Sequence, residues 1–296
     1  MKKYTHLIFV LLSVTAILNS KVATAQTHKI LSYDTIKEKS QVRIGLRYTS
    51  DYLYMGRSDS AKAPYLSPSI SYFHKSGIFL RSSLSYLTAK DEGRIDMITF
   101  SGGYDYYAKD LAIGISVSQY FFSDLSYNVM AEMSTYLNTY ISYDFSLFIL
   151  SADASLAFSG ETDVFSGLEL SRTLYTLNRK LLVTPSIYMN AGTQYYYNEY
   201  YKNRSEQTGS GGMGKGKGVG SQPPSTSRQV VASDDFKILD YEAGLNLTYK
   251  IKNVRLFVSS TWTFPVNPAT LVNDQGEYQE ELKKGFYWSS GLRIIL

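Results

Sequence analysis

Ten charged side chains fall on the polar faces of segments in which apolar and polar residues alternate. The basic ones are Arg43, Arg47, Arg81, Arg255 and Arg293, and the acidic ones are Glu132, Asp153, Glu169, Asp240 and Glu242. Guanidinium groups that face carboxylates across a water-filled space set up a transverse electric field. Such a field orients polar solutes. These residues therefore indicate contact with polar solutes rather than catalysis of a covalent reaction.

Residues for nucleophilic or metal chemistry are scarce. The chain of 296 residues has no Cys and three His, namely His6, His28 and His74. The missing Cys excludes a disulfide framework, a Cys nucleophile and an iron–sulfur site. Three scattered His leave little material for a catalytic triad or a His-based metal site. We predict no cofactor, no metal site and no enzymatic activity.

The first 25 residues have the pattern of a secretory signal peptide. Lys2 and Lys3 precede the apolar run 7–18, and Ala23-Thr24-Ala25 forms a cleavage site of small residues. Twelve apolar residues fall short of the about 20 that span a bilayer as a helix. The net charge of +4 falls to +1 without the three lysines of this segment, so the basic composition does not indicate nucleic-acid binding. Residues 26–40 are then a periplasmic lead.

The mature chain alternates with a period of two residues in segments of about ten residues, the pattern of half-buried strands. In one example, Leu111, Ile113, Ile115 and Val117 alternate with small or polar residues. Twelve segments are expected, at 41–53, 64–74, 77–88, 94–107, 110–122, 131–144, 146–158, 163–175, 180–197, 236–250, 253–264 and 284–296. The number becomes ten or fourteen if one hairpin has been split or missed.

Short and long connections alternate along these segments. Short turns on one side and long loops on the other are typical of an outer-membrane barrel, with turns periplasmic and loops extracellular. Hydrocarbon leaves no partner for an open sheet edge, so only a closed ring of strands can span it. We predict an all-β fold: a transmembrane antiparallel up-and-down β-barrel of 12 strands over residues 41–296. The location is the outer membrane of a Gram-negative bacterium, with both termini periplasmic.

Aromatic composition favours the barrel over a soluble β-sandwich. Thirteen of the 27 Tyr lie near expected strand ends, as in the aromatic girdles at the two membrane interfaces. In the last segment, 284–296, Phe286, Trp288, Leu292 and Ile294 share one face with the terminal Leu296. This pattern resembles the C-terminal signature that the barrel assembly machinery recognises in outer-membrane barrels, although such barrels commonly end in Phe.

Two stretches carry a resemblance to known families. The first, SDYLYMGRS at 50–58, resembles the S-D-Y-x-x-R-G-x-S stretch of TorF-type porins, except that Arg57 follows Gly56 instead of preceding it. The second, WTFPVNP at 262–268, resembles uncharacterised outer-membrane barrels of Bacteroidetes. The resemblance covers a small part of the chain. It implies a porin-like outer-membrane barrel and assigns no site residue.

The longest connection, 198–235, is predicted to be an extracellular loop. Its run 209–220 is rich in Gly and nearly matches a phosphate-binding loop, but no strand leads into it and no helix follows. Pro223 and Pro224 extend its low-complexity character. We interpret it as an exposed loop whose Lys215 and Lys217 could contact lipopolysaccharide or outer-membrane lipid.

Three functions remain open from the sequence. The first is a narrow porin-like channel for passive diffusion of small polar solutes, with the arginines on one wall and the acids on the opposite wall. At mid-depth this sets Arg47 and Arg81 across from Asp153, Glu169 and Glu242. The second is a non-conducting structural or binding barrel that acts through its extracellular loops, with loop 198–235 or direct charge pairs closing the lumen. The third is a barrel-embedded lipid hydrolase, which would need a site without His.

Overall fold

A computed structural model describes residues 39–57, 62–90, 92–126, 128, 130, 133–197, 229–231, 233–273 and 276–296. The predicted signal peptide 1–25, most of the lead 26–40 and most of loop 198–235 lie outside these residues. Within them, no helix has the length and hydropathy of a membrane-spanning segment.

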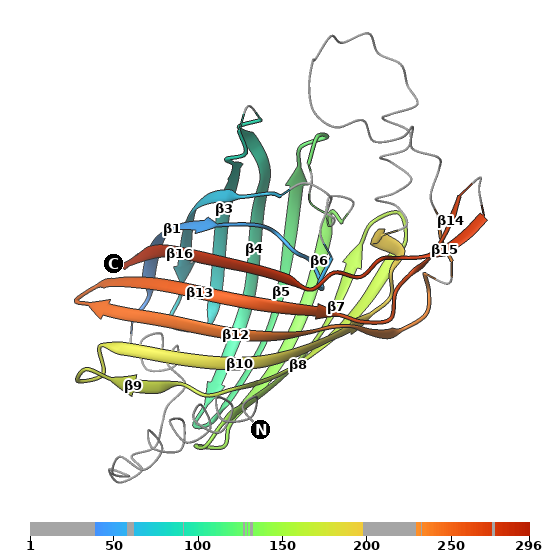
Figure 1. Ribbon diagram of the computed structural model, residues 1–296. Coiled ribbons are helices and arrows are strands. Elements are labelled where there is room, and N and C mark those ends of the chain that lie inside the picture. Colours follow the sequence, from blue (N-terminus) through green and yellow to red (C-terminus); the bar gives the residue numbers. More distant parts are fainter. Residues whose placement is uncertain are drawn as a thin grey trace, which may run out of the picture.

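Twelve antiparallel strands close into one barrel (Figure 1). They are β1 (Gln41–Thr49), β2 (Tyr65–Phe73), β3 (Ile78–Leu87), β4 (Arg94–Ala108), β5 (Leu111–Phe122), β6 (Thr135–Asp144), β7 (Ile149–Phe158), β8 (Thr162–Ser171), β10 (Leu181–Gly192), β12 (Lys237–Ile251), β13 (Val254–Pro265) and β16 (Gly285–Ile295). Each strand pairs with its neighbours in the chain, and β16 pairs with β1 to close the ring. The predicted fold class and strand number are confirmed.

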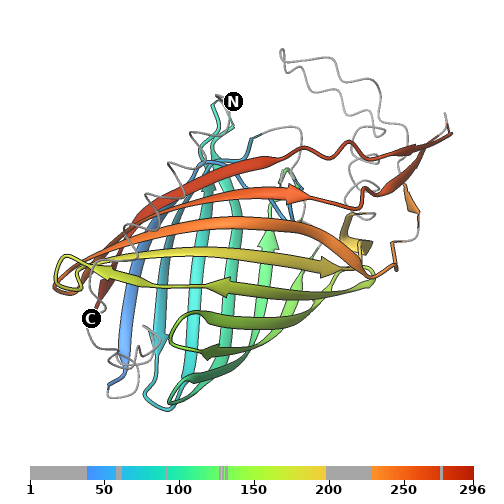
Figure 2. The same ribbon diagram turned by 60° about the horizontal axis from the view of Figure 1, so that its bottom comes forward.

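The ring leaves no free edge. A short strand, β9 (Leu174–Thr176), continues β8 along β10, and β10 pairs with β12 over its full length. Figure 2 shows the strands running side by side around the wall, strongly tilted. Each of the twelve barrel strands therefore has a hydrogen-bonding partner on both sides, as a hydrocarbon environment requires.

The two ends of the barrel differ as the sequence predicts. At one end, here called the turn end, strands join through short turns such as Lys109-Asp110 and Lys252-Asn253. The other, the loop end, carries the long connections. Arg43 of β1 pairs with Ile295 of β16, so the barrel sequence both begins and ends at the turn end.

The loop end holds structure that sequence reasoning misses. A second sheet joins β11 (Gln229–Val231), β14 (Thr270–Asn273) and β15 (Gly276–Gln279), in segments predicted to be loops. Three strand predictions are also too long: β1 ends at Thr49, β10 ends at Gly192 and β6 begins at Thr135. After β1 and β10 the chain packs into the loop end, where Tyr52, Tyr196 and Tyr197 join a buried cluster, and Met133 joins the same cluster just before β6.

Alternation divides each strand between an apolar outer face and a polar lumen. The side chains of Leu80, Ile115 and Ile187 point outward and are 61%, 51% and 59% exposed. The lumen side carries hydroxyl pairs across neighbouring strands, such as Ser101–Ser118 and Ser142–Ser151. A closed sheet with large apolar side chains outside and hydroxyls inside matches a barrel whose outer face lies in lipid.

We expect Ile115→Arg to lower the free energy of unfolding in lipid vesicles by about 2–4 kcal/mol, because an arginine at mid-strand would meet hydrocarbon. The control Leu147→Arg lies in the turn between β6 and β7, where the exposed side chain reaches the interface. It should cost about 0–1 kcal/mol. The measurement is denaturant unfolding from vesicles, and equal losses for the two variants would contradict a lipid-facing outer surface.

Candidate functional site: a charged lumen beneath an aromatic cap

The five predicted arginines all lie on one wall of the lumen. They come from β13, β16, β1 and β3, which follow one another in the ring with only β2 between the last two. Two cavities of about 350 and 300 Å³ open along this wall. Arg43, Arg47 and Arg293 line both, Arg81 lines the first and Arg255 the second. The strand order thus brings together arginines that are far apart in the sequence.

Three of these guanidinium groups, those of Arg43, Arg47 and Arg81, lie over phenylalanine rings rather than against carboxylates. Arg43 lies 4.1 Å from the ring centroid of Phe73, and Arg47 lies 5.2 Å from that of Phe257. Among the described residues, no ion pair joins a lumen arginine to an acid. The alternative in which lumen charges pair directly and close the barrel is not what this arrangement shows.

An acidic wall faces the basic one. Asp153 is on β7 and Glu169 is on β8, and in a ring of twelve these strands lie six positions from β1 and β2. Both residues line a third cavity of about 510 Å³. The Tyr188 hydroxyl donates a hydrogen bond to Asp153. Gly167 makes room for this contact, because a Cβ there would collide with the Tyr188 hydroxyl.

Two predicted acids are not on that opposite wall. Asp240 and Glu242 lie on β12, which pairs directly with β13, so the expected position across from the arginines is wrong for them. The reason is ring closure, which brings β12 to the seam beside the basic strands. They are instead separated from Arg255 along the barrel axis. Arg255 pairs with Lys250 at the turn end, and Glu242 pairs with Thr263 near the loop end. The remaining acid, Glu132, lies outside the described residues.

One lumen acid is absent from the sequence prediction. Asp105 on β4 accepts hydrogen bonds from the Tyr140 hydroxyl at 3.0 Å and the Tyr107 hydroxyl at 3.3 Å. Strand periodicity could have predicted it, because Asp105 shares the lumen face of β4 with Gly103 and Tyr107. It gives the lumen an acid near β3, shielded by two tyrosines.

The loop end of the lumen is crossed by a cluster of buried side chains, which we call the cap. Its centre is the segment 52–57. Tyr52 packs against Tyr65 of β2, and Tyr54 packs edge-on against Phe165 of β8 on the far side of the ring. The other members are Met55, Met130, Met133, Ala157, Tyr196, Tyr197, Val230, Leu239, Ala269 and Leu271, with Tyr120, Phe122, Tyr136 and Tyr278 packed around them.

Gly56 lets this segment approach the barrel wall. Its φ of +74° lies in the left-handed region, and a Cβ there would meet Pro265 at 2.9 Å and Asp240 at 3.1 Å. A side chain at this position would push the segment away from β12 and β13. The cap thus touches the wall at β2, β8 and β12–β13, which places it across the lumen.

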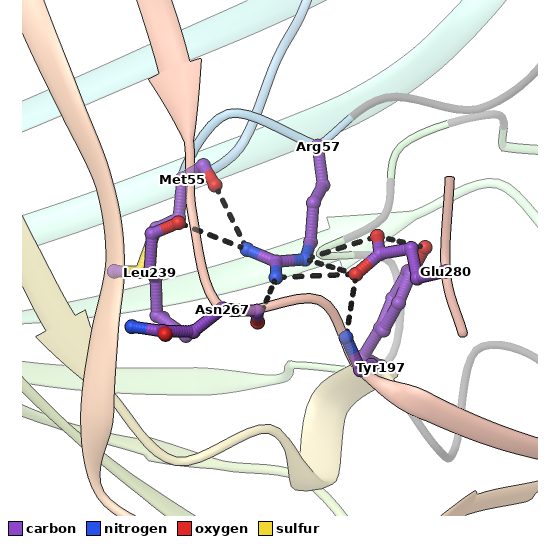
Figure 3. Close-up of polar contacts among 7 residues, drawn as sticks. Met55, Arg57, Tyr197, Leu239, Asn267 and Glu280 are labelled. Carbon is purple, nitrogen blue, oxygen red and sulfur yellow. Dashed lines mark hydrogen bonds and ion pairs between the residues drawn. The ribbon is translucent and has the colours of Figure 1, made fainter. Parts of the chain in front are cut away.

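A buried ion pair ties the cap together (Figure 3). The Nε of Arg57 lies 3.2 Å from a carboxylate oxygen of Glu280, and the two side chains are 2% and 9% exposed. Arg57 also donates to the carbonyls of Met55, Leu239 and Asn267. Glu280 accepts from the Tyr197 hydroxyl at 2.9 Å and from the Ala269 amide at 3.0 Å. One guanidinium and one carboxylate therefore connect three loop-end connections and β12.

Burial sets the charge states in the cap. Burial raises the pKa of the Tyr54 hydroxyl well above its ordinary value, as it does that of Tyr196. Burial by itself lowers the pKa of the Arg57 guanidinium, but nearby Tyr196 and Glu280 outweigh it and raise that pKa above its usual value. The tyrosines are therefore neutral and Arg57 is charged over the whole working range of pH.

His74 lies at the turn end, away from the cap. Its Nδ1 is 2.8 Å from the Ser76 hydroxyl, within the turn between β2 and β3. His28 lies outside the described residues, which also contain no group of three or more His, Cys, Asp or Glu that could hold a metal ion.

Comparisons with known proteins add the following. No family model matches the chain, and no curated protein matches it in sequence. Among solved structures it is similar to a KdgM porin, with a TM-score of 0.45 and 10% identity over 85% of this chain and 98% of that chain. A NanC porin is similar with a TM-score of 0.44 and 9% identity over 86% and 98%. The COG4313 outer membrane channel from Pseudomonas putida F1 has a TM-score of 0.43 and 9% identity over 87% and 95%.

The resemblance to TorF-type porins and to Bacteroidetes barrels stays a prediction. The stretch 50–58 that carries part of it supplies Tyr52, Tyr54, Gly56 and Arg57 to the cap.

We expect Arg57→Met to speed hydrogen exchange of the cap amides, including that of Ala269, by lowering their local opening free energy by about 3–5 kcal/mol. The cause is the uncompensated carboxylate that the substitution leaves buried at Glu280. Glu277→Gln on β15, whose side chain is exposed, serves as the control. The double variant Arg57→Met with Glu280→Gln should cost less than the single one, and unchanged exchange in Arg57→Met would mean that the pair does not hold the cap.

Proposed function

We propose that the barrel spans the outer membrane with its turn end toward the periplasm. The apolar outer face and the closed ring of twelve strands support the first part of this proposal. The alternation of short turns and long loops supports the second. We also retain as proposals the recognition of strand 284–296 by the barrel assembly machinery and contact of the outer loops with lipopolysaccharide.

We propose that the protein is a narrow porin-like channel for small polar solutes. The observation that carries this proposal is the pair of charged walls, with cavities of about 350 and 300 Å³ along the arginines and about 510 Å³ along the acids. Solutes that pass between the walls would be selected by size and oriented by the field. The cavities are lined by small hydroxyl side chains such as Ser69 and Ser83, which is compatible with water in this space.

The behaviour of the cap distinguishes a channel from a non-conducting barrel. It crosses the lumen at the loop end, so we propose that passage requires the cap to move. A second candidate follows from the same observation: a non-conducting barrel that acts through its outer loops, with the cap as a permanent plug. The absence of enzymatic activity stays a prediction.

We expect the refolded chain to show steady conductance steps in planar bilayers, with a preference for anions that shifts toward cations in Arg47→Ala and Arg81→Ala. Each substitution removes a positive charge from the lumen wall, so the local concentration of anions falls. The reversal potential in a salt gradient measures this selectivity. If well-inserted protein shows no conductance, the channel proposal is wrong. If the variants conduct with unchanged ion selectivity, the proposed role of the lumen field is wrong.

We expect Glu280→Gln to raise the open probability of single channels, because it removes the charge that holds Arg57 in the cap. Glu277→Gln makes the same chemical change on an exposed side chain and should behave as the wild type. Bilayer recordings of both variants under one voltage protocol compare them. A Glu280→Gln variant that remains as closed as the wild type, although its cap amides exchange faster, would favour the permanent plug.

A further inference from the structure

The basic wall of the lumen carries more positive charge than its neighbours compensate. Arg255 and Arg293 stand directly opposite each other in the ladder between β13 and β16. Like charges in this position repel. Lys250 of β12 adds a further cation to the cavity that Arg43, Arg47, Arg255 and Arg293 line. This density of cations is unfavourable unless an anion shares the space.

The hydrogen-bonding capacity of these groups is also largely unused. Among the described residues, the guanidinium groups of Arg47, Arg81 and Arg293 take part in no hydrogen bond or ion pair. Arg43 donates one hydrogen bond, to the Gln41 amide oxygen at 3.3 Å, and its Nε is buried without a partner. Arg255 donates only to main-chain carbonyls of its own turn. Each guanidinium offers five N–H donors in a planar fork that matches a carboxylate or a phosphate.

The acids of the lumen do not supply the missing partner. Asp153 is bound by Tyr188, and Asp105 on β4 is bound by Tyr107 and Tyr140. Glu169 lines the cavity on the other wall. Asp240 and Glu242 lie beside the basic strands but nearer the loop end, and Asp240 accepts a hydrogen bond from the Asn190 amide. None of these described acids forms an ion pair with a lumen arginine.

Rings and hydroxyls hold the arginines ready for a ligand. Phe73, Phe257 and Phe79 lie beneath Arg43, Arg47 and Arg81, at 4.1, 5.2 and 5.8 Å from ring centroid to guanidinium carbon. A guanidinium stacked on a ring keeps its edge free for a planar acceptor and loses less freedom on binding. Ser67, Ser69 and Ser83 add hydroxyl donors along the same cavity.

We propose that this wall is a binding site for small organic anions that carry two or more carboxylate or phosphate groups. The two cavities share Arg43, Arg47 and Arg293, so one ligand can place separate anionic groups in each. The inference deepens the proposed function by naming a solute class, and rests on it for the route by which the ligand enters. The binding itself requires no ion flow.

The test is calorimetric titration of the refolded full chain in detergent with citrate, inorganic pyrophosphate and, for comparison, acetate. We expect at least one of the two multiply charged anions to bind more tightly than acetate, and its affinity to fall with added salt. Arg47→Gln and Arg81→Gln should each weaken it by about tenfold or more, the effect of losing a hydrogen bond to a charged group. Arg172→Gln removes an arginine whose side chain is exposed and lines neither cavity, and should leave the affinity unchanged.

Thermal unfolding gives a second readout that a merely structural role would not produce. The ligand should raise the melting temperature of the wild type but not of the double variant Arg47→Gln with Arg81→Gln. Without ligand the double variant should be at least as stable as the wild type. The substitutions reduce the repulsion among the arginines, and they leave no acid without an ion-pair partner.

Failure to bind either anion, or equal binding by the double variant, would overturn the proposal even if the chain conducts. Binding by a chain that does not conduct would uphold the site and refute the channel. Citrate without pyrophosphate would assign the site to carboxylates, and the reverse result would assign it to phosphates.

Discussion

The closed hydrogen-bonded ring is the constraint on which everything else in this protein depends. A strand surrounded by hydrocarbon has no water to satisfy its amides and carbonyls, so both of its edges must be paired. The pairing of β16 with β1 and of β10 with β12 meets this demand and removes the last free edges. Once the ring is closed, alternation along each strand sends one set of side chains outward and the other inward. The lumen is a consequence of that closure.

Closure also decides which charges face one another. Arginines on β13, β16, β1 and β3 are spread from residue 43 to residue 293, yet the ring gathers them on one wall. The same closure brings Glu242 beside the basic strands and leaves Asp153 and Glu169 across from them. Asp153 and Asp105 accept hydrogen bonds from tyrosines, and Arg43, Arg47 and Arg81 lie over phenylalanine rings. A lumen with separated walls of opposite charge has a field across it, which a lumen of paired charges would lack.

The cap sets a second condition on the lumen. Its side chains are mostly aromatic or apolar, so packing and burial supply most of its stability. At its centre lies one ion pair, Arg57–Glu280, whose members also satisfy carbonyls and an amide of the surrounding connections. Replacing only one member of such a buried pair costs much stability, because the other charge is left buried without a partner. The pair also favours one arrangement of the loops over others. The proposed channel therefore has its selectivity in the wall and its closure in the cap.

The sequence by itself determined the barrel, its twelve strands and its alternating turns and loops, because period-two patterning and connection length are local properties. Alternation along each strand also indicates which side chains face the lumen, and it would have placed Asp105 among them. The sequence did not determine that Asp240 and Glu242 lie beside the basic wall, since that depends on which strands meet at the seam. Nor did it reveal the sheet of β11, β14 and β15, which lies in segments predicted to be loops, or the cap, part of which lies in segments predicted to be strands. Arg57 and Glu280 are 223 residues apart, and no local pattern marks either as a partner of the other. Only the tertiary structure brings them together, because their contact depends on loops that fold inward once the ring has closed.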